Sequence, residues 1–238
     1  MRINKFFSDQ GICSRREADR WVEEGRIQIN SKVAKLGDQI HDDDIVSLDG
    51  KIIDRRKKKL VLLAYHKPVG IECTSDPRSE NNIIDAVNYP ERVVHIGRLD
   101  MMSEGLILLT NEGDLVNLIL RGRYGHEKEY LVTYDQPIDR RIKEIYESGV
   151  DIGDERGPTK PCRVELVGSR RLKLILTEGR NRQIRRMAEA VGLKVMRLKR
   201  IRVLNILLGD LQVGKWRHLT SQEEKTLLQT LEGVREKA

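Results

Sequence analysis

The residues best suited to chemistry in this sequence form a short motif in front of an apolar run. Gly97-Arg98-Leu99-Asp100 is followed by Ser103-Glu104-Gly105 and then by Leu106-Ile107-Leu108-Leu109. This order predicts a turn that leads into a buried strand, with a β-like alternation that places Arg98 and Asp100 on one face. A carboxylate in such a place costs free energy unless it is paired, and proteins tolerate that cost most often where the carboxylate reacts. An isolated Arg-Leu-Asp is more often a structural turn, so Asp100 needs support from the rest of the chain.

The charge of the chain indicates a polyanionic partner. The 238 residues carry a net charge of +7 and a pI of about 9.3. Residues 178–202 alone hold nine basic and two acidic side chains, so the positive charge is concentrated on one element. Such a concentration is typical of a nucleic-acid-binding surface, whereas evenly spread charge would indicate only a solvated exterior.

The densest basic segment follows Gly179 and contains Arg180, Arg182, Arg185 and Arg186. Residues 181–191 are expected to be helical, with an apolar stripe on one face and the arginines on a parallel one. A solvated charged face is one interpretation. Four arginines in seven residues beside a glycine turn favour phosphate or carboxylate partners instead.

Two further motifs are weaker on their own. Lys67-Pro68-Val69-Gly70 predicts a tight turn after a strand, because Pro fixes φ and Gly permits positive φ. Tyr130 falls in a predicted strand, where a tyrosine is usually half-buried with its hydroxyl in water. Aromatic residues make up 4% of the chain, which argues against extended stacking on single strands and favours one ring over one base.

Other classes of protein are disfavoured by composition. Cys13, Cys73 and Cys162 lie far apart, and the five histidines are scattered, so we expect no disulfide framework and no metal site. No run of 18 apolar residues is present, and the first residues do not form an apolar signal segment. We therefore expect a cytoplasmic protein without membrane contact.

The chain is predicted to contain two domains. Residues 1–53 form a small module with helices around Phe6 and after Ser14, whose Ser-x-x-Glu spacing is a capping box, and with short strands at 26–29 and 45–48. Residues 54–59 are basic and aperiodic, which predicts a flexible linker. Residues 60–238 form the larger domain.

The larger domain is predicted to be α+β, with a mainly antiparallel sheet, because its short strands do not alternate regularly with helices. Strands are expected at 60–65, 105–110, 128–133, 163–167, 172–177 and 195–206, and helices at 112–120, 138–147 and 181–191. Thr220-x-x-Glu223 opens a last helix.

The N-terminal module resembles the S4-type RNA-binding domain. The resemblance is carried by residues 11–18 and 24–30, and it departs at Ser31, where that family usually has glycine. It implies that Arg15, Arg16 and Arg20, at the start of the second helix, contact RNA phosphates. On charge alone these arginines could equally be solvated surface.

The larger domain resembles the RNA pseudouridine synthases that act on ribosomal RNA. The resemblance is carried by residues 92–106, and further by 67–74, 126–133, 181–187, 202–206 and 216–220. It implies that Asp100 is the catalytic residue, that Arg185 pairs with it and keeps it ionised, and that Tyr130 stacks on the target base.

The same resemblance implies a substrate and a set of RNA contacts. It implies a uridine in large-subunit ribosomal RNA and no cofactor. The basic residues expected to contact RNA in this domain are Lys67, Arg98, Arg180, Arg182 and Arg186. We expect a monomer, since no unexplained apolar stripe is left on the predicted surface elements.

Two alternatives stay open at this point. A non-catalytic RNA-binding or ribosome-assembly factor would explain the basic helix and the N-terminal module equally well. It would not explain an aspartate inside a site that attracts phosphate. The second alternative is a synthase acting on transfer RNA or on small-subunit ribosomal RNA.

Overall fold

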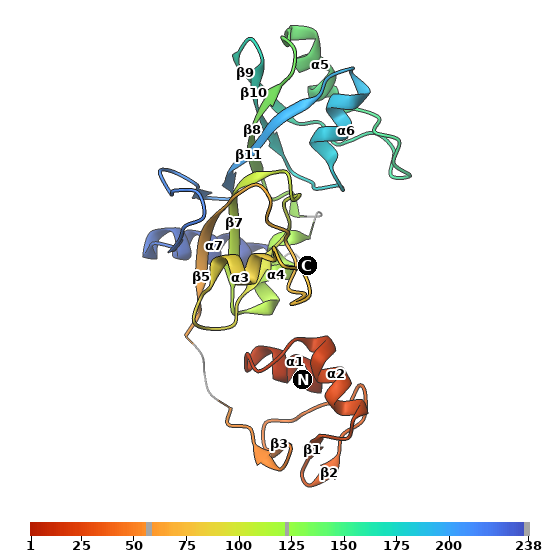
Figure 1. Ribbon diagram of the computed structural model, residues 1–238, viewed down its shortest axis with the longest axis vertical. Coiled ribbons are helices and arrows are strands. Elements are labelled where there is room, and N and C mark those ends of the chain that lie inside the picture. Colours follow the sequence, from red (N-terminus) through yellow and green to blue (C-terminus); the bar gives the residue numbers. More distant parts are fainter. Residues whose placement is uncertain (56–58, 122–123, 236–238) are drawn as a thin grey trace. The chain divides into compact units, whose positions relative to one another are not determined.

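The computed structural model describes residues 1–55, 59–121 and 124–235 (Figure 1). It divides into two compact units. The first contains Met1–Val61 with the short segments Tyr89–Val94 and Asn111–Gly113, and the second contains the remaining residues. Of the linker predicted at 54–59, residues 56–58 lie outside the described residues, and its boundaries stay a prediction.

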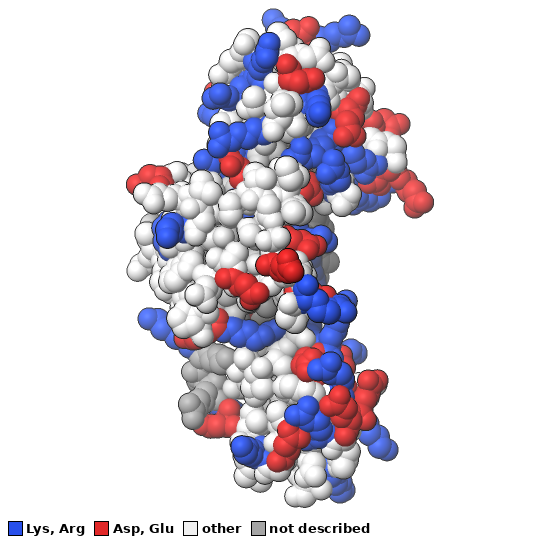
Figure 2. Space-filling view, in the orientation of Figure 1, with Lys and Arg blue, Asp and Glu red and all other residues white. Residues whose placement is uncertain are grey.

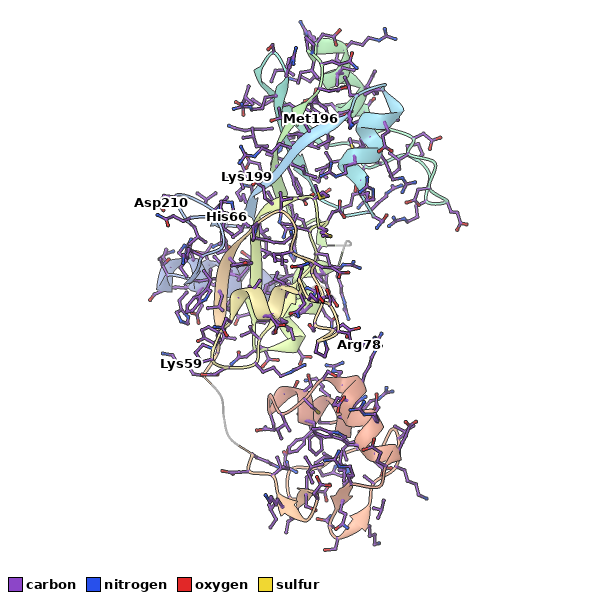
Figure 3. All side chains as sticks on the ribbon, in the orientation of Figure 1. Lys59, His66, Arg78, Met196, Lys199 and Asp210 are labelled. Carbon is purple, nitrogen blue, oxygen red and sulfur yellow. The ribbon has the colours of Figure 1, made fainter. Side chains whose placement is uncertain are left out.

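The helices of the first unit are α1 (Ile3–Asp9) and α2 (Arg15–Glu23). The hydroxyl of Ser14 accepts a hydrogen bond from the backbone N–H of Glu17 at 3.1 Å, which confirms the predicted helix start. The apolar faces of both helices pack into one core, whose side chains can be followed in Figure 3. Its most buried members include Ile3, Phe6, Phe7, Ala18, Val22 and Ile27.

The strands of the first unit form a four-stranded antiparallel sheet in the order β2-β1-β3-β4. They are β1 (Ile27–Ile29), β2 (Lys32–Val33), β3 (Val46–Leu48) and β4 (Lys51–Ile52). Asp49 and Gly50 join β3 to β4 with φ of 50° and 77°, the conformation that a two-residue hairpin requires. Ser31 has φ of 65° in the β1–β2 turn, so serine adopts here the left-handed conformation that usually selects glycine.

The second unit is built on a nine-stranded sheet. Its main order is β13-β5-β7-β11-β8-β10-β9, with β6 beside β7 and β12 beside β11. The pairing is mainly antiparallel, as predicted, except that β7 and β11 are parallel. Figure 1 shows β5, β7, β11 and β8 following one another along this unit. The strands are β5 (Leu62–Lys67), β6 (Val94–Ile96), β7 (Glu104–Thr110), β8 (Lys128–Tyr134), β9 (Arg163–Gly168), β10 (Arg171–Leu176), β11 (Val195–Val203), β12 (Ile206–Leu207) and β13 (Trp216–His218).

In the described part of this unit, five helices accompany the sheet. They are α3 (Ile83–Val87), α4 (Gly113–Leu120), α5 (Arg140–Ser148), α6 (Gln183–Ala190) and α7 (Ser221–Arg235). The last four confirm predicted helices, whereas α3 was not predicted because it is only five residues long. The Thr220 hydroxyl and the Glu223 carboxylate each accept the other residue's backbone N–H, so the capping box predicted for α7 is present.

Several predicted boundaries differ from the observed ones by a few residues. The strand predicted at 60–65 runs from 62 to 67 and includes Lys67, which the Pro-x-Gly pattern had placed in the following turn. The strand predicted at 195–206 ends at Val203, because Leu204 adopts φ of 52° and turns the chain into β12. The helix predicted from Asn181 begins at Gln183, because Arg182 has φ of 50°.

Candidate active site

Asp100 lies in the loop between β6 and β7. The backbone N–H of Ser103 donates to the Asp100 carbonyl at 2.9 Å, which closes a turn directly before the buried strand β7. The Leu99 N–H donates to the Cys73 thiol, and the Leu99 side chain is buried. The loop is therefore anchored on both sides of Asp100, whose side chain stays 31% exposed.

The predicted turn before a buried strand is confirmed, and Arg98 and Asp100 share one face with Leu99 buried between them, although no strand forms here. Residues 97–103 belong to no strand. Gly97 has φ of 75°, and this backbone bend, instead of a strand pleat, directs the following residues. Arg98 and Asp100 nevertheless line the same cleft.

Gly105 explains why the motif ends in glycine. A Cβ at this position would lie 2.2 Å from the Arg200 carbonyl oxygen and 2.6 Å from its nitrogen. The two residues are direct partners in the parallel pairing of β7 and β11. Glycine is required here because the backbone of β11 occupies the space of a side chain.

Lys67 supports the Asp100 loop from below the surface. Its side chain is fully buried, and its Nζ donates to the carbonyls of Pro68 at 2.8 Å and Met101 at 3.4 Å. The Gly70 N–H donates to the same Met101 carbonyl at 2.9 Å. The prediction that Lys67 contacts RNA is therefore wrong for this structure, because its ammonium group is enclosed by the two loops that it joins.

Arg185 on α6 reaches the same loop. Its Nη2 donates to the Met102 carbonyl at 2.7 Å, and its Nη1 donates to the Val195 carbonyl at 3.2 Å. Its Nε lies 3.9 Å from Oδ2 of Asp100, close enough for an ion pair but too far for a hydrogen bond. Burial lowers the pKa of Arg185, followed by the charge of Arg182. Arginine nevertheless stays protonated in proteins, so a cation faces the Asp100 carboxylate.

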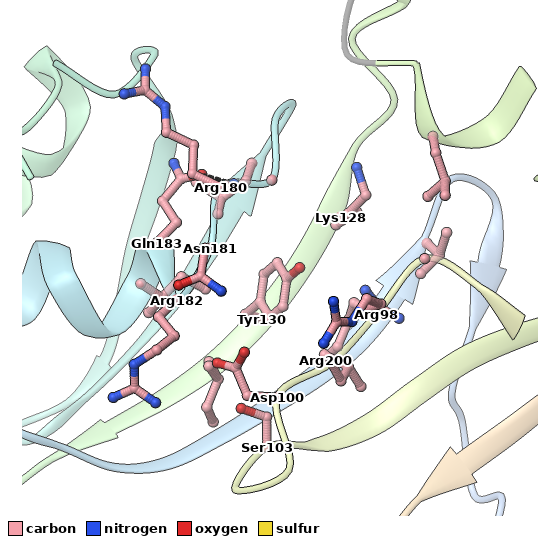
Figure 4. Close-up of a pocket in the computed structure, with 18 of the residues that line it drawn as sticks. Arg98, Asp100, Ser103, Lys128, Tyr130, Arg180, Asn181, Arg182, Gln183 and Arg200 are labelled. Carbon is pink, nitrogen blue, oxygen red and sulfur yellow. Dashed lines mark hydrogen bonds between the residues drawn. The ribbon is translucent and has the colours of Figure 1, made fainter. Parts of the chain in front are cut away.

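Asp100 opens onto a cleft of about 440 Å³ in the second unit (Figure 4). Tyr130 on β8 forms part of its wall and is 8% exposed. In Figure 4, Asn181 and Arg182 lie on one side of the Tyr130 ring, Arg98 and Arg200 on the other, and Asp100 near its lower edge. The structure thus brings together Asp100 and Tyr130, residues 30 positions apart in the sequence, in one cavity that can hold a small planar group.

The predicted arginines separate into two groups. Arg98 and Arg182 are exposed and line the cleft, where they can contact an anion. Arg180 is only 5% exposed and donates to the carbonyls of Gly157 and Pro158, so it holds a loop in place although it borders the cleft.

Arg186 does not line the cleft. It donates to the Ile152 carbonyl and lies 3.6 Å from the Asp154 carboxylate. The structure does not support the prediction that Arg180 and Arg186 contact RNA, because both guanidinium groups already bind carbonyl oxygens of this chain. In the first unit, Arg15, Arg16 and Arg20 are exposed on α2, and Arg20 pairs with Glu17 and Glu24.

Two further cations line the cleft that were not predicted from the sequence, Lys128 and Arg200. Arg200 is 3% exposed, and its Nε donates to the Leu106 carbonyl at 2.7 Å. Burial, with the charge of Arg200, lowers the pKa of Lys128 to about 8. The signal available in the sequence was the spacing Lys-x-Tyr, which places Lys128 and Tyr130 on the same face of a strand.

The charge of the second unit gathers near these elements. On the face drawn in Figure 2, Lys and Arg are concentrated in the region where Figure 1 places α6. Within the described part of the chain, no group of three or more His, Cys, Asp or Glu could hold a metal ion. A search of the described helices finds none that is long and apolar enough to cross a membrane.

Comparisons with known proteins agree with this geometry. Residues 61–190 match the family model of the RNA pseudouridylate synthases, and residues 1–46 match the S4 domain. The dual-specificity RNA pseudouridine synthase RluF of Escherichia coli is 46% identical over 233 residues, which cover 98% of this chain and 80% of that protein. The ribosomal large subunit pseudouridine synthase B of Bacillus subtilis is 33% identical over 235 residues, which cover 95% of each.

A solved structure described as a pseudouridylate synthase has a TM-score of 0.70 and 28% identity, and the match covers 95% of this chain and 99% of that one. The chain therefore belongs to the RNA pseudouridine synthases, which are isomerases, and carries an RNA-binding S4 domain at its N-terminus. Within that family it falls in the branch that contains synthases B and F. A non-catalytic assembly factor is excluded by this membership.

Proposed function

We propose that this enzyme converts one specific uridine of large-subunit ribosomal RNA into pseudouridine, with Asp100 as the catalytic residue. The observation that carries the proposal is the common cleft of Asp100, Tyr130 and Arg98, with Arg185 holding the Asp100 loop from behind. The large-subunit target is supported by the name of the Bacillus subtilis relative. Because ribosomal RNA is modified where ribosomes are assembled, we place the enzyme in the cytoplasm, and we expect it to act as a monomer.

The reaction breaks the N1–C1′ bond, turns the uracil and joins C5 to C1′. A uridine in folded RNA must first leave its stack, which costs a few kcal/mol. Phosphate contacts from exposed cations offset that cost, and Arg98 and Arg182 at the cleft, with Arg15, Arg16 and Arg20 on the S4 domain, are our candidates.

Asp100 acts on the ribose of the everted nucleotide, either as a nucleophile at C1′ or as a base. Its partial exposure to the cleft leaves an oxygen accessible to substrate. Tyr130 stacks on the uracil, and its hydroxyl is our candidate for the group that takes the C5 proton. Arg185 keeps the carboxylate oriented, since it donates to the Met102 carbonyl of the loop and also attracts Oδ2 electrostatically.

Transfer RNA is a second candidate substrate. The Escherichia coli relative is named a dual-specificity synthase, which favours more than one RNA class. Transfer RNA is the class that the sequence analysis left open. A short stem-loop shared by two RNAs could present the same everted uridine to the cleft.

Chemical mapping of pseudouridine in ribosomal and transfer RNA from a deletion strain tests this proposal. We expect one large-subunit position to lose its pseudouridine and to regain it when the full chain is supplied on a plasmid. A loss at transfer RNA as well would support the second substrate. If every large-subunit pseudouridine persisted in the deletion strain, the proposed target would be wrong.

A further inference from the structure

Arg200 is a buried cation with one donor that the protein does not use. It lies on β11 directly opposite Tyr130 on β8, so the two side chains share the face that lines the cleft. Its Nε is fixed by the Leu106 carbonyl at 2.7 Å, whereas its Nη2 has no hydrogen-bond partner among the described residues. A buried charged donor without an acceptor costs free energy, so this position calls for an acceptor from a ligand.

The wall around this donor is cationic. Lys128 lies two residues from Tyr130 on the same strand and lines the same cleft. Its Nζ donates to the His126 carbonyl at 3.3 Å, and the charge of Arg200 contributes to its lowered pKa. Among the described residues that line the cleft, Asp100 is the one carboxylate. A single carboxylate cannot neutralise both Lys128 and Arg200.

Arg200 differs in its burial from the cations that are suited to bind phosphate. Arg98 and Arg182 are exposed, where a backbone phosphate of a bound RNA would lie. Arg200 is 3% exposed and lies beside the ring that the proposed function places against the base. Enzymes that evert a nucleotide read its base by hydrogen bonds to the base edge together with stacking, and both requirements meet at Arg200 and Tyr130.

We propose that Nη2 of Arg200 donates a hydrogen bond to a carbonyl oxygen of the everted uracil and is a specificity-determining group of this enzyme. The inference rests on the proposed function and deepens it. A guanidinium has five donors and no acceptor, so it fits an oxygen of uracil. If that oxygen is O4, cytosine is rejected, because its exocyclic amino group would meet the donor.

The same contact assists the reaction. When the N1–C1′ bond breaks, its electron pair stays on the base and is shared among N1, O2 and O4. The fixed charges of Arg200 and Lys128 stabilise that anion more strongly than the neutral base, which lowers the barrier. C5 then bonds to C1′ and its proton is lost while N1 gains one, so the isomerisation balances without another reagent.

Thio-substituted RNA tests the contact in the wild-type full chain. The substrates are one RNA stem-loop containing the mapped target nucleotide as uridine, 2-thiouridine or 4-thiouridine, with pseudouridine formation followed by nucleoside chromatography under single-turnover conditions. Sulfur is a weak acceptor. We expect one of the two thio substrates to react about tenfold more slowly than uridine, because a charged hydrogen bond is weakened. Equal rates on all three substrates would overturn the inference.

Variants then locate the contact. Arg200→Gln is expected to slow the uridine substrate by about tenfold or more and to remove the thio penalty. Arg202→Gln is the matched control, since Arg202 lies two residues along the strand, pairs with Glu127 and Glu129, and does not line the cleft. It is expected to retain the penalty. Thermal unfolding checks that both variants fold.

The remaining outcomes contradict the inference in distinguishable ways. One outcome is that Arg200→Gln lowers RNA affinity and reduces the slope of log affinity against log salt by about one, while the thio penalty stays. In that case Arg200 binds a phosphate. If the variant is slow on all substrates with an unchanged penalty and an unchanged salt slope, its role is structural. A wild-type enzyme inactive on every uridine RNA would instead contradict the proposed function. If Arg200→Gln does not fold, the wild-type thio series decides alone.

Discussion

Arg185 is the residue that couples the basic helix to the reactive loop. It donates to the carbonyl of Met102, two residues after Asp100, and its Nε faces the carboxylate at 3.9 Å. Its removal leaves the Met102 carbonyl of the Asp100 loop without its donor and the carboxylate without its cation. The residue therefore acts on position as well as on charge.

We predict that Arg185→Ala lowers the single-turnover rate by about 100-fold or more, because misplacement of a reacting group by about 1 Å has an effect of this size. RNA affinity should change much less. Arg163→Ala is the control, since Arg163 is exposed on β9 and pairs with Glu127. Full activity with an unchanged pH profile in Arg185→Ala would show that the pairing has no function.

Lys128 gives the cleft a pH dependence. Burial lowers its pKa from 10.5 to about 8, so the side chain is cationic below about pH 8 and neutral above it. In the unfolded chain it keeps its proton up to its ordinary pKa, so its burial disfavours folding below about pH 8. This penalty is relieved as the pH rises from about 8 to about 10.5.

We predict that the reaction slows as the pH rises through about 8, because a positive charge leaves the cleft. Lys128→Arg should abolish this decline, since arginine stays charged. The measurement is a pH–rate profile of both proteins at saturating RNA. Identical profiles would show that Lys128 does not control the reaction.

The sequence predicted the residues that have an intrinsic signal and missed those defined by the fold. Asp100, Tyr130 and Arg185 stand in recognisable motifs and do meet around the cleft. Arg200 becomes notable only through its burial and the missing partner of its Nη2, which depend on neighbours 70 or more positions away. For Lys67 the sequence predicted an RNA contact that the fold does not allow. The charge of a lysine does not reveal that its side chain is buried.

At the scale of elements, the site depends on the close approach of β7 and β11. Asp100 lies in the loop that leads into β7, Arg200 lies in β11, and Gly105 makes the close approach of the two strands possible. A side chain at 105 would have to separate the strands and would also be strained at φ of 113°.

We predict that Gly105→Ala lowers the free energy of unfolding by about 3 kcal/mol or more, from overpacking and strain together. Denaturant unfolding measures this change. Gly113→Ala is the control, because a Cβ there meets nothing within 4 Å and its φ is not positive. It should unfold like the wild type, and an equal stability of Gly105→Ala would contradict the packing argument.

Element types followed from periodicity, whereas their order in the sheet did not. Apolar spacing predicted α4, α5 and α6 and the main strands to within a few residues. The order β13-β5-β7-β11-β8-β10-β9 and the parallel pair depend on contacts between distant segments, for which the sequence has no local signal. Short elements such as α3 and β13 also lack enough residues to show a period.

At the scale of the whole molecule, we expect exposed cations of both units to bind RNA. The S4 domain presents Arg15 and Arg16 on α2, and the synthase domain presents Arg98 and Arg182 at the cleft. Each phosphate contact releases a counterion, so affinity should fall steeply with salt.

We predict that Arg15→Ala with Arg16→Ala weakens RNA binding and reduces the slope of log affinity against log salt by about 1.5. The single-turnover rate at saturating RNA should change far less than Kd. Arg26→Gln is the control in the same domain, since Arg26 is already paired with Asp49 at 2.7 Å. An unchanged salt slope in the double variant would show that these two arginines do not contact phosphate.

The most direct test of the whole account is tritium release from RNA labelled at C5 of uridine, measured for Asp100→Asn. We predict a loss of about 1,000-fold or more in rate with RNA affinity within about twofold of wild type, because the substitution removes the reacting carboxylate and little else. Asp76→Asn, which alters an exposed carboxylate paired with Arg78, should release tritium normally. Release by Asp100→Asn at the wild-type rate would contradict the account.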